Sequence, residues 1–245
     1  MSHYLKPNWP AAKNVHSFTT LRHNGYSKAP FDAFNLGFNT EDDPAHVAKN
    51  RSLLQSELNL KYEPFWLEQK HSNLAVPATS ENLSKPICAD ATFTTKPNLA
   101  CVILTADCIP ILFCDEKATI VAAAHAGWRG IASGIIENTI ASMRVDSSKI
   151  LAWLGPAIGP EKFVVNSDMR EQFVKQNPNA ACAFKEYQDR WLADIYTLAK
   201  QRLTACGVTA IYGGDRCTYS EPELFFSYRR DQGKTGRNAS LIWLT

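Results

Sequence analysis

The sequence predicts an α+β fold of packed layers rather than a doubly wound parallel sheet. Segments that alternate like strands and segments with helical periodicity follow one another without a strict βα order. The chain has 245 residues, 45% of them hydrophobic, which is enough to bury a substantial core. No internal repeat, low-complexity segment or Gly/Ser linker divides it. We therefore expect one domain or two tightly packed halves.

The N-terminal part predicts a strand, a long loop, a helix and a second, short strand. Residues 15–21 alternate like a strand, and residues 23–40 form a loop rich in Gly, Asn and Pro. An Asp-Pro pair marks a helix start at Pro44. One face of this helix carries Val47, Leu54 and Leu58. Residues 64–68 predict the short strand, so His71 would lie just past its end.

The centre of the chain is its most apolar part. Residues 100–115 are almost continuously apolar apart from Ala-Asp-Cys and one proline, which predicts a buried strand with a bend or bulge. Residues 117–125 predict a second buried strand that ends at His125, followed by a glycine-flanked turn and a helix. One side of this helix carries Ile131, Ile135, Thr139 and Met143.

The C-terminal part predicts further strands around one helix. Residues 151–160 form a strand that runs into a Gly/Pro turn, and residues 194–206 form an amphipathic helix that a glycine closes. Residues 210–219 and 239–244 predict late strands. The polar, glycine-containing loop 227–237 separates them.

Charge and cysteine content exclude several classes of protein. The net charge of +2 is spread along the chain without a basic cluster, so no nucleic-acid partner is expected. No apolar run is long enough to span a bilayer, and the N-terminus does not resemble a signal peptide. The seven cysteines include no CxxC pair. We expect a cytoplasmic protein with reduced thiols and no membrane partner.

Cys108 and His125 are the first candidates for a functional site. Each lies where strand character breaks or ends, beside small or turn-forming residues, and scaffolds often hold binding groups at such positions. A lone Cys-His pair is weak support for a site. The alternative is a buried thiol and a hydrogen-bonded core histidine.

Two segments are candidates for holding an anion. HAGWRG places a glycine turn and a helix start after a strand, and Arg129 in the first turn could add a bidentate fork for phosphate or carboxylate. The loop 227–237 gathers basic residues around two glycines. These are Arg229, Arg230, Lys234 and Arg237. Simple solvation of these side chains is the alternative, and the loop matches no P-loop.

Motifs that are absent from the sequence argue against several kinds of metal site. The chain has six histidines and no HxH pair, which excludes a multicopper oxidase on one chain. No methionine stands where a blue-copper site would need its axial ligand. The HxE and PCxxC motifs of zinc nucleobase deaminases are also absent.

Eight motifs together resemble one known family. In order they are FNLGFNTEDDP, VAKNR, LEQKH, ADATFTT, LTADCIPILF, AAHAGWRG, LGPAIGP and SYRRDQGKTGR. This set is similar to the YfiH/YlmD family, known as laccase-like polyphenol oxidoreductases and later associated with purine nucleoside phosphorolysis. The resemblance covers nearly the whole chain and implies a single YfiH-like domain over residues 1–245. It also implies a layered α/β/β/α sandwich with mixed sheets, related to the CNF-type/YfiH-like cysteine hydrolase fold.

The resemblance implies a catalytic zinc held by His71, Cys108 and His125. Three N/S ligands leave one position open on a tetrahedral zinc, as in catalytic sites. Copper is the alternative metal, because such a donor set generally binds Cu²⁺ more tightly. The activity implied is phosphorolysis of adenosine, inosine and methylthioadenosine to the free base and ribose 1-phosphate, with possible deamination of adenosine. The expected partners are therefore a purine nucleoside and phosphate.

Individual roles follow from these motifs. The predicted catalytic residues are Cys108, His125 and Asp107, the last as an acid/base group or as a support for the zinc ligands. Its adjacency to Cys108 motivates that role, and a capping carboxylate in the bend is the alternative. The predicted substrate-binding residues are Arg22, Asn35, Gln69, Arg129, Arg229 and Arg230. The four arginines among them are candidates for holding phosphate.

Three alternatives stay open. In the first, the protein is a cysteine hydrolase with Cys108 as nucleophile and His125 as base, and His71 is incidental. The second is a copper-dependent polyphenol oxidase. The third is a non-catalytic binding protein, which no exposed apolar stripe or charged tail supports. No sequence feature predicts an oligomeric state.

Overall fold

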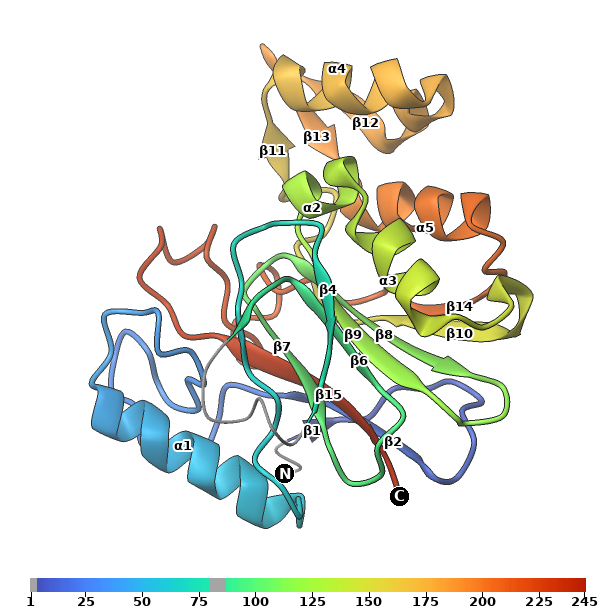
Figure 1. Cartoon of the computed structure of the whole chain (residues 1–245). Coiled ribbons are helices and arrows are strands. Elements are labelled where there is room, and N and C mark those ends of the chain that lie inside the picture. Colours follow the sequence, from blue (N-terminus) through green and yellow to red (C-terminus); the bar gives the residue numbers. More distant parts are fainter. Residues whose placement is uncertain (1–3, 80–86) are drawn as a thin grey trace.

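The computed structural model describes residues 4–79 and 87–245 (Figure 1). Within these residues the chain forms a mixed α+β fold with several sheets, which confirms the predicted fold class at that level. The first three residues of the N-terminal segment lie outside the described part. No helix in the described part has the length and apolar character needed to cross a bilayer.

One four-stranded sheet has the order β1-β2-β15-β7, and its neighbours are all antiparallel. The strands are β1 (Tyr4–Leu5), β2 (Val15–Thr20), β7 (Cys101–Thr105) and β15 (Asn238–Leu244). Helix α1 (Pro44–Glu57) packs on its outer face through Leu54, which shares a cluster with Val102 and Leu241. Asp43 begins this helix as predicted, since its carboxylate accepts a hydrogen bond from Ala45 N.

A second, six-stranded sheet has the order β14-β10-β8-β9-β6-β4 and contains both parallel and antiparallel pairs. The strands are β4 (Ala75–Pro77), β6 (Ala91–Thr94), β8 (Ile109–Asp115), β9 (Val121–Ala126), β10 (Ile150–Leu154) and β14 (Ala210–Gly213). Three helices, α2 (Trp128–Ser133), α3 (Ile135–Met143) and α5 (Ile195–Ala205), pack on one face of this sheet. The other face meets the four-stranded sheet.

Strand β8 shows why the central segment is apolar throughout. Ile109, Ile111 and Phe113 point to the helices, whereas Leu112 and Cys114 point to the four-stranded sheet. Because both faces of the strand are covered, no polar residue alternates with the apolar ones.

Two predicted elements are each divided in the structure. Residues 100–115 form not one bent strand but β7 and β8, which belong to different sheets, and Asp107 at the crossing has a positive φ of 90°. Because both faces of this segment are buried, its residues are apolar throughout, and the sequence does not indicate to which sheet each half belongs. The predicted helix after His125 is α2 and α3, divided at Gly134, whose φ of 97° is left-handed. Its predicted inward residues are nevertheless buried.

Two small sheets complete the fold. Strands β11 (Val164–Val165), β12 (Phe184–Tyr187) and β13 (Arg190–Ala193) form an antiparallel sheet beside α4 (Ser167–Gln176), and β3 (Leu67–Glu68) pairs with β5 (Ile87–Cys88). Short 3-10 helices cover Ser147–Lys149 and Pro178–Ala183. The sheet of β11 to β13 was not predicted from the sequence, because its strands are short and largely exposed.

Candidate metal centre and cavity

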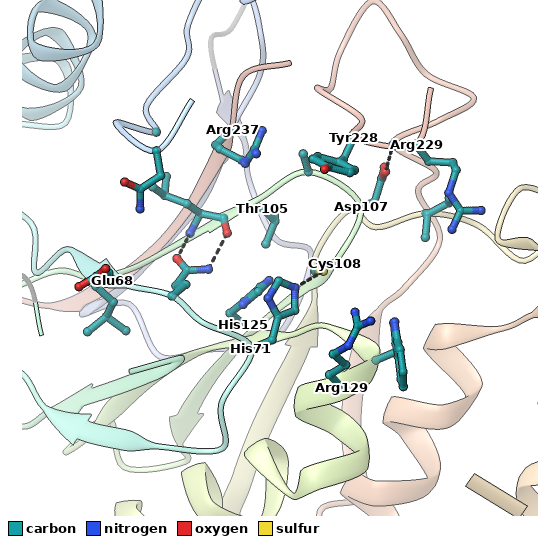
Figure 2. Close-up of a pocket in the computed structure, with 18 of the residues that line it drawn as sticks. Glu68, His71, Thr105, Asp107, Cys108, His125, Arg129, Tyr228, Arg229 and Arg237 are labelled. Carbon is teal, nitrogen blue, oxygen red and sulfur yellow. Dashed lines mark hydrogen bonds between the residues drawn. The ribbon is translucent and has the colours of Figure 1, made fainter. Parts of the chain in front are cut away.

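Three predicted side chains from separate segments meet at one point. His71 follows β3, Cys108 precedes β8, and His125 lies near the end of β9. Their ligand atoms all lie within 4.8 Å of one another (Figure 2). Cys108 Sγ is 3.7 Å from His71 Nε2, and the two imidazole rings meet edge to face at 4.7 Å between centroids. We call these three residues the ligand cluster.

The pairing of β8 with β9 produces this proximity. Ile109 lies opposite Ala126 in the antiparallel register, so Cys108 lies beside the residue that follows Ala126. That residue is Gly127. A Cβ atom there would lie 2.8 Å from His71 Cδ2 and 2.9 Å from Cys108 Sγ. Only glycine leaves the space beside His71 and Cys108 open.

A buried carboxylate that the sequence analysis did not single out joins both histidine segments. Asp90 Oδ1 accepts hydrogen bonds from His125 Nδ1 at 2.8 Å and from the His71 backbone N at 3.0 Å. Asp90 Oδ2 accepts from the Lys70 backbone N and from both the backbone N and hydroxyl of Ser72. This carboxylate fixes the ring of His125 with Nε2 available to a metal. Its position inside the ADATFTT motif was the available signal.

The electrostatics of the ligand cluster favour a charged pair. Burial alone raises the pKa of the Cys108 thiol, but the two histidines outweigh burial and lower that pKa to about 6. Burial likewise lowers the pKa of His125, but Cys108 and Asp90 outweigh it and raise that pKa to about 9. For Asp90, burial is outweighed by hydrogen bonds from His125 and Ser72, which hold its pKa well below the usual range. A thiolate is therefore available at neutral pH.

The donor set fits a transition metal. Two imidazole nitrogens and one thiolate suit zinc or copper, and the described residues contribute three ligands to this cluster. Three protein ligands leave a position open for a water or a substrate atom. The ligand cluster therefore fits a catalytic metal better than a structural one.

The ligand cluster opens into a cavity of about 740 Å³. Aromatic and cationic side chains are prominent in its lining. The aromatic ones are Phe38, Trp66, Trp128, Phe163 and Tyr228. The charged ones include Arg51, Glu68, Arg129, Arg229 and Arg237. This size and composition are typical of a small-molecule site.

Three predicted substrate-binding residues line this cavity. Arg129 is exposed there, with its guanidinium 4.3 Å from the ring centroid of Trp128. Arg229 also lines the cavity, and its Nη1 donates to Val164 O at 2.9 Å. Gln69 lines it too, but both ends of its amide are hydrogen-bonded to the backbone of Leu104 at 2.8 Å. Its polar atoms therefore join two segments of protein.

Two predicted phosphate-binding arginines lie outside the lining and support loops instead. Arg22 donates to the carbonyl oxygens of Asp32 and Pro222. Arg230 pairs with the Asp231 carboxylate and donates to carbonyl oxygens nearby. The neighbours Arg229 and Arg230 have different surroundings, since only Arg229 lines the cavity. The composition of a loop does not reveal which of its basic side chains faces a cavity.

Asn35, predicted to bind substrate, is fully buried and also lies outside the lining. Its Oδ1 accepts hydrogen bonds from the backbone N of Gly37 at 3.0 Å and of Arg237 at 2.9 Å. It therefore holds two cavity loops together.

Asp107 uses both carboxylate oxygens within the protein. Oδ1 accepts from the Thr218 hydroxyl at 2.6 Å, and Oδ2 accepts from the Arg229 backbone N at 2.6 Å. These bonds anchor the loop 227–237 beside the ligand cluster. Both partners lie far from the bend in the sequence, so the carboxylate joins the bend to this loop rather than capping it, and the acid/base role stays a prediction.

Two further lining residues, Phe38 and Arg51, were not predicted as part of the site, whereas Arg237 was a candidate for holding an anion. Arg51 lies between two aromatic rings, 4.4 Å from the centroid of Phe38 and 3.7 Å from that of Trp66. Arg237 lines the cavity near Tyr228. Phe38 and Arg51 belong to the motifs FNLGFNTEDDP and VAKNR, which were the available signal.

Comparison with known proteins places the chain in a family. A family model described as multi-copper polyphenol oxidoreductase laccase matches residues 16–245. The Escherichia coli purine nucleoside phosphorylase YfiH is 48% identical over 244 residues, covering 100% of both chains. A Pseudomonas aeruginosa protein also named purine nucleoside phosphorylase is 47% identical over 246 residues, covering 100% of this chain and 99% of its own.

Solved structures agree with these relationships. A Neisseria meningitidis protein superposes with a TM-score of 0.95 at 44% identity and covers 99% of each chain. YlmD from Geobacillus stearothermophilus superposes with a TM-score of 0.93 at 29% identity, covering 99% of this chain and 96% of its own. From the family match, the full-length relatives and these structures, we conclude that the chain belongs to the laccase-like YfiH family.

Proposed function

We propose that the protein is a zinc-dependent purine nucleoside phosphorylase. It would convert adenosine or inosine and phosphate into the free base and ribose 1-phosphate, and methylthioadenosine and phosphate into adenine and 5-methylthioribose 1-phosphate. The names of the full-length relatives support this proposal. The observation that carries it is the ligand cluster, which opens into a cavity lined by arginine and aromatic side chains.

His71, Cys108 and His125 would hold the zinc, and Asp90 would orient His125 from behind. When bound, zinc supplies a Lewis acid that stabilises negative charge developing in the transition state. Gly127 leaves the space beside His71 and Cys108 free of side-chain atoms.

The protein's arginines have a separate task in this reaction. Phosphorolysis breaks the C1′–N9 bond with its electron pair left on the base, which takes up a proton, while a phosphate oxygen bonds to C1′. Arg129 and Arg229 would grip the phosphate, because both line the cavity with exposed side chains. Arg237 is a further cation in the same lining.

Asp107 would act as a positioning residue. Its two hydrogen bonds hold Thr218 and the backbone of Arg229, so it sets the place of a phosphate-binding arginine without touching substrate. We also place the enzyme in the cytoplasm, consistent with free cysteines throughout, and treat residues 1–245 as one domain.

One observation favours a second candidate function, a cysteine hydrolase. The lowered pKa of Cys108 and the raised pKa of His125 are typical of a nucleophilic thiolate beside an imidazolium. His71, 3.7 Å from the same sulfur, is the third ligand in the zinc proposal and has no task in this one. The relation to the cysteine hydrolase fold stays a prediction.

The test combines zinc and copper analysis with a product assay on wild-type protein and Cys108→Ala. We expect about one zinc per chain in the wild type, and phosphate-dependent release of adenine and ribose 1-phosphate from adenosine. Both should be lost in Cys108→Ala and kept in Cys182→Ala, which removes an exposed cysteine outside the cluster. Inosine among the products would reveal deamination. Metal-free wild-type protein with a reactive Cys108 would favour the hydrolase, and copper with phenol oxidation would favour the polyphenol oxidase.

A further inference from the structure

Among the arginines that line the cavity, the two exposed ones lie on the same side of the ligand cluster. Figure 2 shows Glu68 on one side of the ligand cluster, with Arg129 and Arg229 on the other side. A phosphate is attracted by these two exposed guanidinium groups, whereas the Glu68 carboxylate pairs with Lys70 Nζ at 2.7 Å. The phosphate is therefore expected on the Arg129 side, which leaves the Glu68 side for the nucleoside.

A stack of three side chains lies in the lining of the cavity. The guanidinium of Arg51, from helix α1, lies between the rings of Phe38 and Trp66, and Arg51 Nε donates to Leu36 O at 3.0 Å. Trp66 precedes Glu68 by two residues, which places the stack near the Glu68 end. We call Phe38, Arg51 and Trp66 the aromatic wall.

Phe38 presents an open surface of this wall to the cavity. The side chain packs on Arg51, yet 46% of Phe38 is exposed. Its loop is held in place, because Asn35 Oδ1 accepts from the backbone N of Gly37 and of Arg237. An aromatic ring that is exposed, fixed and backed by a stacked cation offers a ready surface for another flat ring.

The other strongly exposed aromatic residue in the cavity has a different setting. Tyr228 is 55% exposed, but it belongs to the loop that carries Arg229 and Arg237. The guanidinium of Arg237 lies 5.7 Å from its ring centroid. Tyr228 directly precedes Arg229, so it borders the side of the cavity where phosphate would bind.

From these observations we propose that the purine base of the substrate stacks on Phe38 of the aromatic wall, with the Glu68 carboxylate at the edge of the base. Because Lys70 Nζ pairs with Glu68 Oε1 at 2.7 Å, Glu68 Oε2 would accept the hydrogen bond from the N1–H of hypoxanthine or the amino group of adenine. The neighbouring Gln69 is unsuited to this task, because Leu104 already occupies its amide. The sugar would then lie across the ligand cluster and the phosphate at Arg129. This assignment rests on the proposed nucleoside phosphorylase function.

The experiment compares zinc-loaded wild type with Phe38→Ala and Phe38→Trp. Loss of the stacking surface should raise KM for inosine about ten- to a hundred-fold in Phe38→Ala, and Phe38→Trp should restore it. KM for phosphate should stay within about twofold in both variants, because the phosphate end is untouched. Calorimetric titration with hypoxanthine alone should show the same loss and restoration of binding. Tyr26→Ala removes a similarly exposed aromatic residue outside the cavity, so it should leave KM for inosine and the affinity for hypoxanthine unchanged.

The outcomes separate this proposal from the proposed function. If wild type cleaves inosine and Phe38→Ala keeps its KM and its hypoxanthine affinity, the function stands and the base assignment is overturned. If Tyr228→Ala loses hypoxanthine affinity and Phe38→Ala does not, the base binds at the opposite end. If wild type cleaves no nucleoside but binds hypoxanthine through Phe38, the base site stands and the phosphorylase proposal is lost. Wild type that binds no purine overturns the base site.

Discussion

Asp90 Oδ1 lies 2.8 Å from Nδ1 of His125, in a pair that is almost excluded from solvent. Asp90 has no exposed surface and His125 has only 5%. The same carboxylate accepts the backbone N–H of His71, so one buried group orients two of the three metal-ligand candidates. The zinc affinity of the ligand cluster should therefore depend on Asp90 as well as on the three ligands.

Replacing Asp90 by Asn should weaken zinc binding about ten- to a hundred-fold, because the variant keeps the shape but loses the charge that orients and polarises His125. Competition with a chromophoric chelator measures the zinc affinity. Asp115→Asn is the matched control, since Asp115 is also buried and hydrogen-bonded but lies in a turn with Thr119. Equal zinc affinities in wild type and Asp90→Asn would show that Asp90 only supports the fold.

Alkylation should show the charge state of Cys108 in metal-free protein. The thiolate is the reactive form, and the two histidines lower the pKa of Cys108 from its ordinary value to about 6. The rate with iodoacetamide should rise as the pH increases through about 6 and level off by pH 8. Burial raises the pKa of Cys101 to about 12, so Cys101 should stay unlabelled at pH 8. Mass spectrometry of peptides measures both sites.

Zinc should suppress this labelling, because a thiolate that binds metal is not free to attack the reagent. A Cys108 that reacts equally well with and without bound zinc would contradict its place among the ligands. A rate that rises only near pH 9 would contradict the charged pair with His125.

Substituting Ala for Gly127 should lower zinc affinity by about tenfold or more, because the new Cβ would lie within 3.0 Å of both His71 and Cys108. Zinc titration of the purified variant measures this effect. Gly134→Ala is the control, since its left-handed backbone makes the substitution strained but it lies between α2 and α3, away from the cluster. It should lower the Tm and leave zinc affinity unchanged. The reverse result would show that Gly127 serves only the helix start.

Replacing Arg129 by Ala should raise KM for phosphate. A hydrogen bond to a charged group contributes about 1.5–3 kcal/mol, which corresponds to roughly a ten- to a hundred-fold change. KM for nucleoside should change much less, because Arg129 lies opposite Glu68 across the ligand cluster. Arg22→Ala should lower the free energy of unfolding through its lost carbonyl contacts while KM for phosphate stays the same. Steady-state kinetics with each substrate varied separately decides between these outcomes.

Local features of the sequence determined much of the fold. The Asp43 cap, the buried Val47 and Leu54 of α1 and the buried side of the helix after His125 depend on short-range periodicity and capping, so they could be predicted. The third residue predicted for the face of α1, Leu58, lies past the end of the helix and is only partly buried. The ligand cluster was predicted from the resemblance that its motifs carry. Its three residues are distant in sequence, and neither composition nor spacing states that they meet.

Tertiary structure alone decided the rest. The run 100–115 crosses from one sheet to the other because β7 and β8 have different partners, and a strand buried on both faces does not encode its neighbours. Arg22 and Arg230 resemble Arg129 in sequence, but carbonyl oxygens of remote segments hold the first two and leave the third exposed in the cavity. Asp90 and the aromatic wall became functional candidates only when folding brought them to the ligand cluster and its cavity. Chemistry is local to a residue, whereas proximity depends on the packing of the whole chain.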